Sequence, residues 1–316
     1  MQFRSGYFIL SLILFISALL LFASTATNQN GSNDLLNLCQ QPQNGDSAST
    51  PRNEVKQQLA LDYKTHVAEL RKSVSDDFTI IVEKPFVVIG DQSPALVKRW
   101  SEGTIRWAVK QIKESYFKNE PDHIINIWLF KDKASYEKNT KALFGSVPTT
   151  PYGYYSPSDK ALVMNISTGG GTLVHEIVHP FMAANFAACP SWFNEGLASL
   201  YEQSSERNGK IVGLTNWRLR GLQLAIKDDL LGSFERMMST DDRGFYEGDS
   251  TNYAQARYLC YWLQESGVLR DYYRSFAANA AADPTGIKTL KKILQRDDLE
   301  KFQTEWENYV LRLRFR

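Results

Sequence analysis

The sequence has few cysteines and no excess of charge of either sign. Its 316 residues include three cysteines, too few for a disulfide scaffold, and their odd number permits at most one bridge, for which Cys189 and Cys260 are the pair to test. The 36 lysines and arginines are balanced by 35 aspartates and glutamates, so no net field draws the chain to nucleic acid. We therefore expect no nucleic-acid partner, and the composition favours no particular oligomeric state.

Long apolar runs are also lacking, except at the N-terminus. Arg4 is followed by an apolar run from Tyr7 to Ala23 and then by small residues at 24–26. A basic start, an apolar middle and small residues at the end are typical of a secretory signal peptide, here residues 1–26. The run is also close to the roughly 18 residues that begin to span a membrane, so an uncleaved N-terminal anchor is the alternative. Both interpretations predict an exported protein, periplasmic or secreted, with membrane association possible only through this segment.

Apolar residues are again scarce between residues 27 and 54, which are rich in Asn, Gln, Ser and Gly. Such a segment buries too little apolar surface to fold, and this predicts a polar linker. The remaining residues, 55–316, have the ordinary composition of one folded domain.

Two lobes are expected within this domain. In residues 55–167, β-branched and aromatic runs at 78–91 and 123–130 predict strands, and two such runs around the polar segment 156–159 predict a hairpin. Helical spacing in the same lobe predicts helices over 55–74, 93–117 and 133–144, the last ended by Gly145. Residues 168–316 show helical patterns to the end. The predicted fold class is α+β: an N-terminal lobe with a small mixed sheet and an edge hairpin, followed by a mostly helical lobe.

Histidine is scarce too, with four in the chain, yet two of them share one short motif. Residues 175–179 read HEIVH and match the HExxH pattern, which puts His175 and His179 about one helical turn apart on one helix face. Both imidazoles can then bind one metal ion. Zinc lowers the pKa of a coordinated water to about 7, and Glu176 can take its proton as the water attacks a carbonyl carbon. The alternative is that both histidines are ordinary helix residues; His66 and His123 we interpret as structural.

A catalytic zinc site needs a third protein ligand and one open position. Glu195 follows His179 by sixteen residues, in the segment PSWFNEGLAS. The intervening residues are long enough for the first helix to end and turn back, and Pro190 and Ser191 are start signals for a second helix. We therefore expect Glu195 to face the two histidines from that second helix.

The combination HEIVH … WFNEGLAS resembles the gluzincin zinc metallopeptidases, and in particular the bacterial peptidase-MA-like group. The resemblance covers roughly residues 152–202, with a weaker similarity at 252–263. It implies a zincin-like fold with one Zn²⁺ held by His175, His179 and Glu195, and with Glu176 as the catalytic base.

Some positions depart from the family pattern. Pro180 follows the second histidine and removes a helical N–H, which predicts a kink after the metal-binding turn. Thermolysin-like members carry an Asp four residues after the third ligand, where it supports a histidine, whereas this chain has Ser199. The chain also lacks the Gly-x-Met-Glu-Asn segment of aminopeptidases, which disfavours that specificity.

A zinc hydrolase further needs a donor for the oxyanion that forms on the attacked carbonyl. Related enzymes supply a Tyr or His from the helical lobe, and Tyr253 is the candidate by position, with Tyr246 and Tyr258 as rivals. The alternative for Tyr253 is a core aromatic in an amphipathic helix. The hairpin before the metal-binding helix is either an edge strand that pairs with an extended peptide or an ordinary part of the sheet.

The sequence therefore predicts a zinc metallopeptidase, gluzincin type and most simply an endopeptidase, acting on extracytoplasmic proteins or peptides. One alternative is a catalytically inactive zincin-fold binding or assembly protein. Another is hydrolysis of a different amide, because the motif specifies the attacking water better than the substrate.

Overall fold

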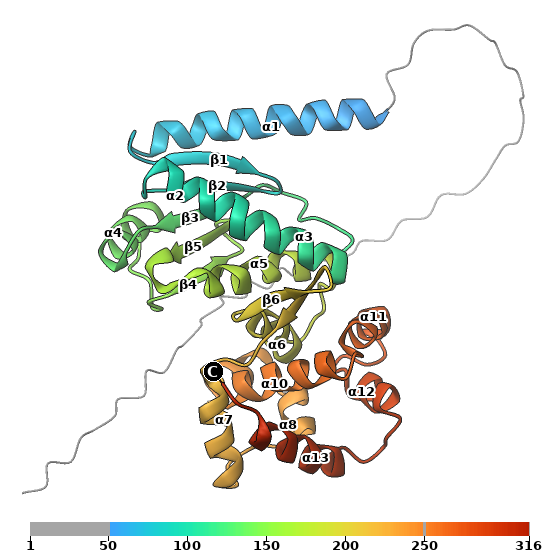
Figure 1. Ribbon diagram of the computed structural model, residues 1–316. Helices are drawn as coiled ribbons and strands as arrows, with labels where there is room; N and C mark the ends of the chain where they lie inside the picture. Colours follow the sequence, from blue (N-terminus) through green and yellow to red (C-terminus); the bar gives the residue numbers. More distant parts are fainter. Residues whose placement is uncertain (1–50, 249–250, 316) are drawn as a thin grey trace, which may run out of the picture.

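A computed structural model describes residues 51–248 and 251–315 of the protein (Figure 1). The predicted signal peptide and most of the predicted linker lie outside the described residues. Helix α1 begins at Pro51 and ends at Ser73, so residues 51–54, which we assigned to the linker, are helical. Within the described parts of the chain, no helix is both long enough and apolar enough to cross a membrane.

The first lobe is built on a mixed five-stranded sheet, and the predicted α+β class is confirmed. The strand order is β1-β2-β3-β5-β4. The central pairs β2–β3 and β3–β5 are parallel, whereas the outer pairs β1–β2 and β4–β5 are antiparallel. The strands are β1 Thr79–Glu83, β2 Phe86–Gly90, β3 Ile125–Phe130, β4 Gly153–Ser156 and β5 Ala161–Asn165. The predicted hairpin is thus β4–β5, and β4 lies at the sheet edge.

Helices cover both faces of this sheet because its central strands are apolar on both sides. Val88, Leu129 and Leu162 point into the core shared with the helical lobe, whereas their neighbours Ile89 and Trp128 point into a second core under α1 and α4. The remaining helices of the lobe are α2 Pro94–Arg99, the π-helix η1 Trp100–Ile105, α3 Arg106–Ser115 and α4 Lys133–Phe144. The stretch predicted as one helix over 93–117 therefore contains a π-helical segment, and α4 ends, as predicted, at Gly145 with φ 82°.

The second lobe is mostly helical, with one exception that the sequence analysis missed. Its helices are η2 Ile166–Thr168, α5 Gly170–Asn185, α6 Ser191–Leu200, α7 Arg218–Lys227, α8 Phe234–Ser239, α9 Asp242–Glu247, α10 Asn252–Glu265, α11 Leu269–Asn279, α12 Ile287–Leu294 and α13 Leu299–Arg312. Between α6 and α7 a hairpin forms from β6 Ser204–Arg207 and β7 Lys210–Gly213. Its turn is Asn208-Gly209, both with positive φ, which is the strongest two-residue hairpin signal.

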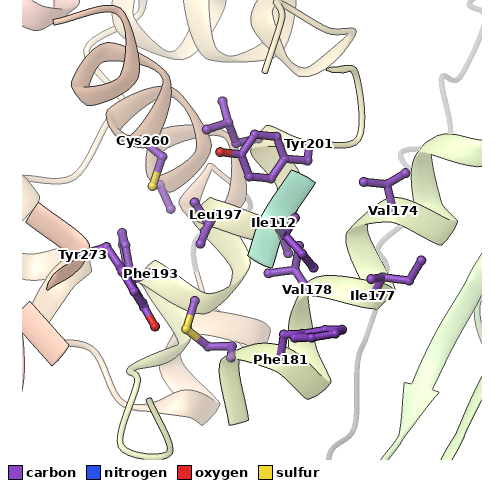
Figure 2. Packing of buried hydrophobic residues seen from close by; sticks show 14 of the residues in the cluster. Ile112, Val174, Ile177, Val178, Phe181, Phe193, Leu197, Tyr201, Cys260 and Tyr273 are labelled. Carbon is purple, nitrogen blue, oxygen red and sulfur yellow. The ribbon is translucent and has the colours of Figure 1, made fainter. Parts of the chain in front are cut away.

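Helix α5 lies where the two lobes meet and has two distinct faces. Val174, Ile177, Val178 and Phe181 have the i, i+3, i+4, i+7 spacing of one helix face, and all are buried. Figure 2 shows them in one cluster with residues of α6 such as Leu197. Because each residue turns the helix by about 100°, His175, Glu176 and His179 are directed to a different side from this core face. The helix continues through Pro180 to Asn185.

Helix α10 packs closely against α6. A Cβ atom at Gly196 would lie 3.0 Å from the backbone carbonyl oxygen of Ala256, so a larger residue would push α6 and α10 apart by a few tenths of an ångström. The same contact puts Cys260 into the buried core. Cys189 and Cys260, the pair to test for a disulfide, form no bridge in this structure, in which both thiols are free.

Candidate metal centre

The two histidines of HEIVH and Glu195 converge on one point. The Nε2 atom of His175 lies 3.2 Å from Oε2 of Glu195, and Nε2 of His179 lies 3.9 Å from Oε1 of the same carboxylate. One ligand atom of each of the three residues lies within 4.8 Å of the others, so the group could hold a metal ion. Ligands of a tetrahedral zinc are about 3.3 Å apart, given bonds of roughly 2.0–2.1 Å. The spacing fits a single small cation.

The outer nitrogens of both imidazoles face oxygen acceptors. Nδ1 of His179 lies 3.0 Å from Oδ1 of Asn194 and is placed to donate to it. Nδ1 of His175 lies 3.4 Å from Oε1 of Glu202. An acceptor at Nδ1 favours the tautomer whose proton is on Nδ1, which leaves Nε2 free to bind a metal. Both rings are therefore oriented with Nε2 toward the point where Glu195 arrives.

Glu202 is the support that the sequence analysis did not find. It is buried, and Arg218 donates to both of its oxygens, from Nε at 3.0 Å and from an Nη at 2.7 Å. Asn216 donates a further hydrogen bond to Oε2 at 3.0 Å. Burial raises the pKa of the Glu202 carboxyl, but Arg218 and His175 lower it by more, so the pKa is about 2. An ionised carboxylate, paired with Arg218, thus stands behind His175.

Glycine at 171 allows this support to approach α5. A Cβ atom at Gly171 would lie 2.2 Å from the backbone carbonyl oxygen of Glu202, a separation that no larger residue can adopt without moving the backbone. The glycine-rich start of α5 therefore sets the distance between the helix that carries His175 and the carboxylate behind it.

The two oxygens of Glu195 have different surroundings. Oε1 accepts a hydrogen bond of 3.0 Å from the hydroxyl of Tyr246, whereas Oε2 is buried without a hydrogen-bond partner. A buried carboxylate oxygen with no donor is costly unless a cation occupies the remaining direction. Burial raises the pKa of the Glu195 carboxyl, but His179 and His175 lower it by more, so the pKa is below its ordinary value. Glu195 is therefore an ionised group with one free oxygen directed to the histidines.

Glu176 stands beside the group without belonging to it. Its Oε2 atom lies 3.9 Å from Nε2 of His179, and its side chain is almost fully buried. Burial raises the pKa of Glu176, which the two histidines only partly offset. Two further carboxylates, Glu195 and Glu202, are buried nearby, and of the two only Glu202 has an arginine partner, Arg218. A divalent cation among these groups would balance the excess of buried negative charge.

Two cavities meet at Glu176, which lines both. Cavity 1, of about 350 Å³, is lined mainly by Thr150, Tyr152, Gly153, Thr168–Thr172, His175, Gln203, Trp217, Arg218 and Tyr253. Cavity 2, of about 210 Å³, is lined mainly by Tyr155, Pro157, His179, Met182, Ala183, Phe186, Ala187, Cys189, Glu195 and Tyr246. Strand β4 contributes Gly153 to the first and Tyr155 to the second. The sheet edge thus runs past the metal group from one cavity to the other.

The three candidate tyrosines have separate surroundings. Tyr253 lines cavity 1, and its hydroxyl is shielded from solvent without a hydrogen-bond partner. Tyr246 lines cavity 2 and donates to Glu195. Tyr258 is a core residue whose hydroxyl accepts from the backbone N–H of Asn216 at 3.0 Å, so it is not a candidate. Of these three tyrosines, Tyr253 is the one that combines a hydroxyl without a hydrogen-bond partner with a place in a cavity beside Glu176.

A family model described as "Protein of unknown function (DUF1570)" matches residues 170–284. The chain is similar to this family over that range, from the first residue of α5 to the segment after α11. The matched range contains His175, His179, Glu195 and the supports Asn194 and Glu202, together with Tyr253. No curated protein matches the chain.

The other two histidines are away from this site. Nε2 of His66 lies 2.7 Å from Oδ1 of Asn126, next to the sheet, and Nδ1 of His123 lies 2.6 Å from Oδ1 of its neighbour Asp122. Neither lines a cavity with the metal group. Both are held by nearby polar groups, in agreement with the structural interpretation.

Proposed function

We propose that the protein is a zinc-dependent peptidase of the gluzincin type, with a zincin-like fold and with Zn²⁺ held by His175, His179 and Glu195. The observation that carries the proposal is the convergence of two Nε2 atoms and one partner-free carboxylate oxygen beside a further buried carboxylate, Glu176. Two nitrogens and one oxygen are the ligand set of many catalytic zinc sites, in which one position stays open.

Bound zinc would act as a Lewis acid: it would activate a water molecule and polarise the carbonyl group that this water attacks. Glu176 accepts the proton of that water and later donates it to the leaving nitrogen. Burial suits the carboxylate to this exchange, because it raises the pKa toward the range in which a group both takes and gives a proton. The Tyr253 hydroxyl donates a hydrogen bond to the oxyanion, for which its lack of any other partner leaves it free.

The sheet edge supports a peptide as substrate. Strand β4 pairs with β5 on one side and, in the described part of the chain, with no strand on the other. It passes both cavities, so an extended peptide added along it would cross the metal group with side chains near each cavity. The N-terminal apolar segment supports an extracytoplasmic substrate, since such a segment directs export.

The test is a paired assay of wild type and Glu176→Gln on one protein preparation. The wild type should cleave casein or a peptide library. The rate of the variant should be lower by about 10²–10⁴-fold while its zinc is retained, because only the proton acceptor is removed. Equal rates for the two proteins would reject Glu176 as the base. Cleavage by neither protein, with a partner co-purifying, would favour the inactive binding protein instead.

A further inference from the structure

Arg257 is a buried cation to which the proposed mechanism gives no role. It lies on α10, its side chain is fully buried, and its Nη1 atom has no hydrogen-bond partner. In the described part of the chain, its other nitrogens bind backbone carbonyls and not carboxylates. A buried charge without an ion pair is costly, because it loses its hydration. Arg257 therefore depends on these carbonyl contacts, which connect two parts of the site.

The carbonyls that Arg257 binds belong to two separate segments. Its Nε atom donates to the carbonyl oxygen of Ser199 at 2.9 Å, and one Nη donates to that of Leu200 at 3.4 Å. Both carbonyls lie at the C-terminus of α6, where helix carbonyls lack intrahelical partners and carry partial negative charge. The same Nη donates to the carbonyl oxygen of Leu214, in the loop between β7 and α7. Arg257 thus joins the end of α6 to the β7–α7 loop.

The end of α6 leads directly into Glu202, the carboxylate behind His175. The carbonyl oxygen of Ser199 accepts the backbone N–H of Glu202 at 3.3 Å, in addition to the Nε of Arg257. One oxygen therefore contacts both residues. A shift of this carbonyl would move the Glu202 backbone with it.

The β7–α7 loop leads to the donors of that carboxylate, Asn216 and Arg218. Helix α10 holds this loop a second time, because the backbone N–H of Asn216 donates to the hydroxyl of Tyr258 at 3.0 Å. Tyr258 follows Arg257 in the chain, and the Arg257 guanidinium lies over its ring, 4.7 Å from the centroid. Two consecutive residues of α10 therefore fix the loop that carries the donors.

We infer that Arg257 is a positioning residue of the metal centre. It holds the end of α6 against the β7–α7 loop, so that the Glu202 carboxylate and its donors meet beside Nδ1 of His175. Arg257 belongs neither to the metal group nor to the lining of either cavity, so its effect on zinc binding passes through Glu202. This inference rests on the proposed zinc site.

The experiment compares Arg257→Met with a matched control on the same helix, Gln255→Met. Gln255 is also buried and donates to a backbone carbonyl, that of Gly232 at 2.7 Å, which lies outside the two joined segments. Chelator competition gives the zinc affinity, and circular dichroism shows whether each protein is folded. Arg257→Met should lower the affinity by about tenfold or more, because Glu202 loses its position, whereas the control should change it by no more than about twofold. At saturating zinc the kcat of Arg257→Met should return to within about twofold of wild type, since the ligands and Glu176 remain.

A double-mutant cycle shows whether the effect passes through Glu202. In the Glu202→Gln background, Arg257→Met should lower the zinc affinity by no more than about a further twofold, because the carboxylate that it positions is already gone. Additive losses, a wild-type affinity in Arg257→Met, or equal losses in both methionine variants would overturn the inference and leave the proposed zinc site standing. Wild-type protein that binds no zinc would overturn both.

Arg257→Lys provides the same comparison if the methionine variant does not fold. It keeps the buried charge, but lysine lacks the planar fork with which arginine donates to both segments. Its zinc affinity should be lower than that of wild type by about threefold or more, and the loss should again disappear in the Glu202→Gln background. A lysine variant with the wild-type affinity would overturn the inference.

Discussion

The site is built from two regions that position their side chains in different ways. Helix α5 supplies His175, Glu176 and His179 within five consecutive residues, so one helical turn sets their relative positions. The segment from α6 to α7 supplies Glu195, Asn194, Glu202 and Arg218 from residues spread over several elements, and their positions depend on how those elements pack. The α5 half can therefore be specified locally, whereas the α6–α7 half exists only in the folded protein. Variants in the α6–α7 half should therefore show how much each tertiary contact contributes to zinc binding and activity.

The largest effect is expected at the ligand from the second half. Glu195→Ala removes one of three protein ligands, so we expect loss of bound zinc and of peptidase activity down to the uncatalysed level. Metal analysis and peptide cleavage measure the two effects, with Glu114→Ala, at an exposed residue of α3, as the control. Zinc retained at the wild-type ratio would show that the two histidines of α5 suffice and that Glu195 is no ligand.

The next effect separates the two tyrosines near the site. Tyr253→Phe should lower kcat by about 10²–10³ and leave the zinc content unchanged, because it removes an oxyanion donor and no contact to a ligand. Tyr246→Phe should instead act mainly on the metal: it should weaken zinc binding, because the hydrogen bond to Glu195 is lost. Steady-state kinetics and zinc titration on both proteins test this, and the role assigned to Tyr253 fails if its variant keeps the wild-type kcat.

A smaller effect is expected behind His175. Glu202→Gln keeps the shape but removes the charge beside Nδ1 and opposite Arg218, and zinc affinity should fall by about 10- to 100-fold. Activity should return when zinc is added in excess, since the ligands remain. Competition with a chromogenic chelator gives the affinity. If excess zinc restores nothing, Glu202 acts on the fold and not on the histidine.

The sequence allowed most of the α5 half to be predicted. The i, i+4 spacing of the histidines and the start signals at Pro190 and Ser191 predict the three candidate ligands, which the structure brings together in a group that could hold a metal ion. The mixed sheet and the edge hairpin also followed from the pattern of apolar runs. These features depend on local periodicity, which is visible along the chain.

What was missed depends on packing across distance. The family pattern puts the support for a histidine four residues after the third ligand, at Ser199, whereas Glu202 follows Glu195 by seven residues and lies in the turn after α6 ends at Leu200. Glu202 is visible in the sequence, but its partner Arg218 reaches it only when the chain is folded. Asn208-Gly209 predicts a hairpin turn between β6 and β7, but the polar residues on either side of it do not show the apolar pattern of a strand.

We propose that two imidazoles and one carboxylate bind a single zinc ion. The most direct test is X-ray absorption at the zinc edge, combined with metal analysis, on purified protein. We predict about one zinc per chain, with nitrogen and oxygen neighbours at about 2.0–2.2 Å and no sulfur. Cys189 lines the same cavity as His179 and Glu195, so it is the sulfur ligand that this cavity could supply. A sulfur neighbour at about 2.3 Å, or protein that binds no zinc, would contradict the claim.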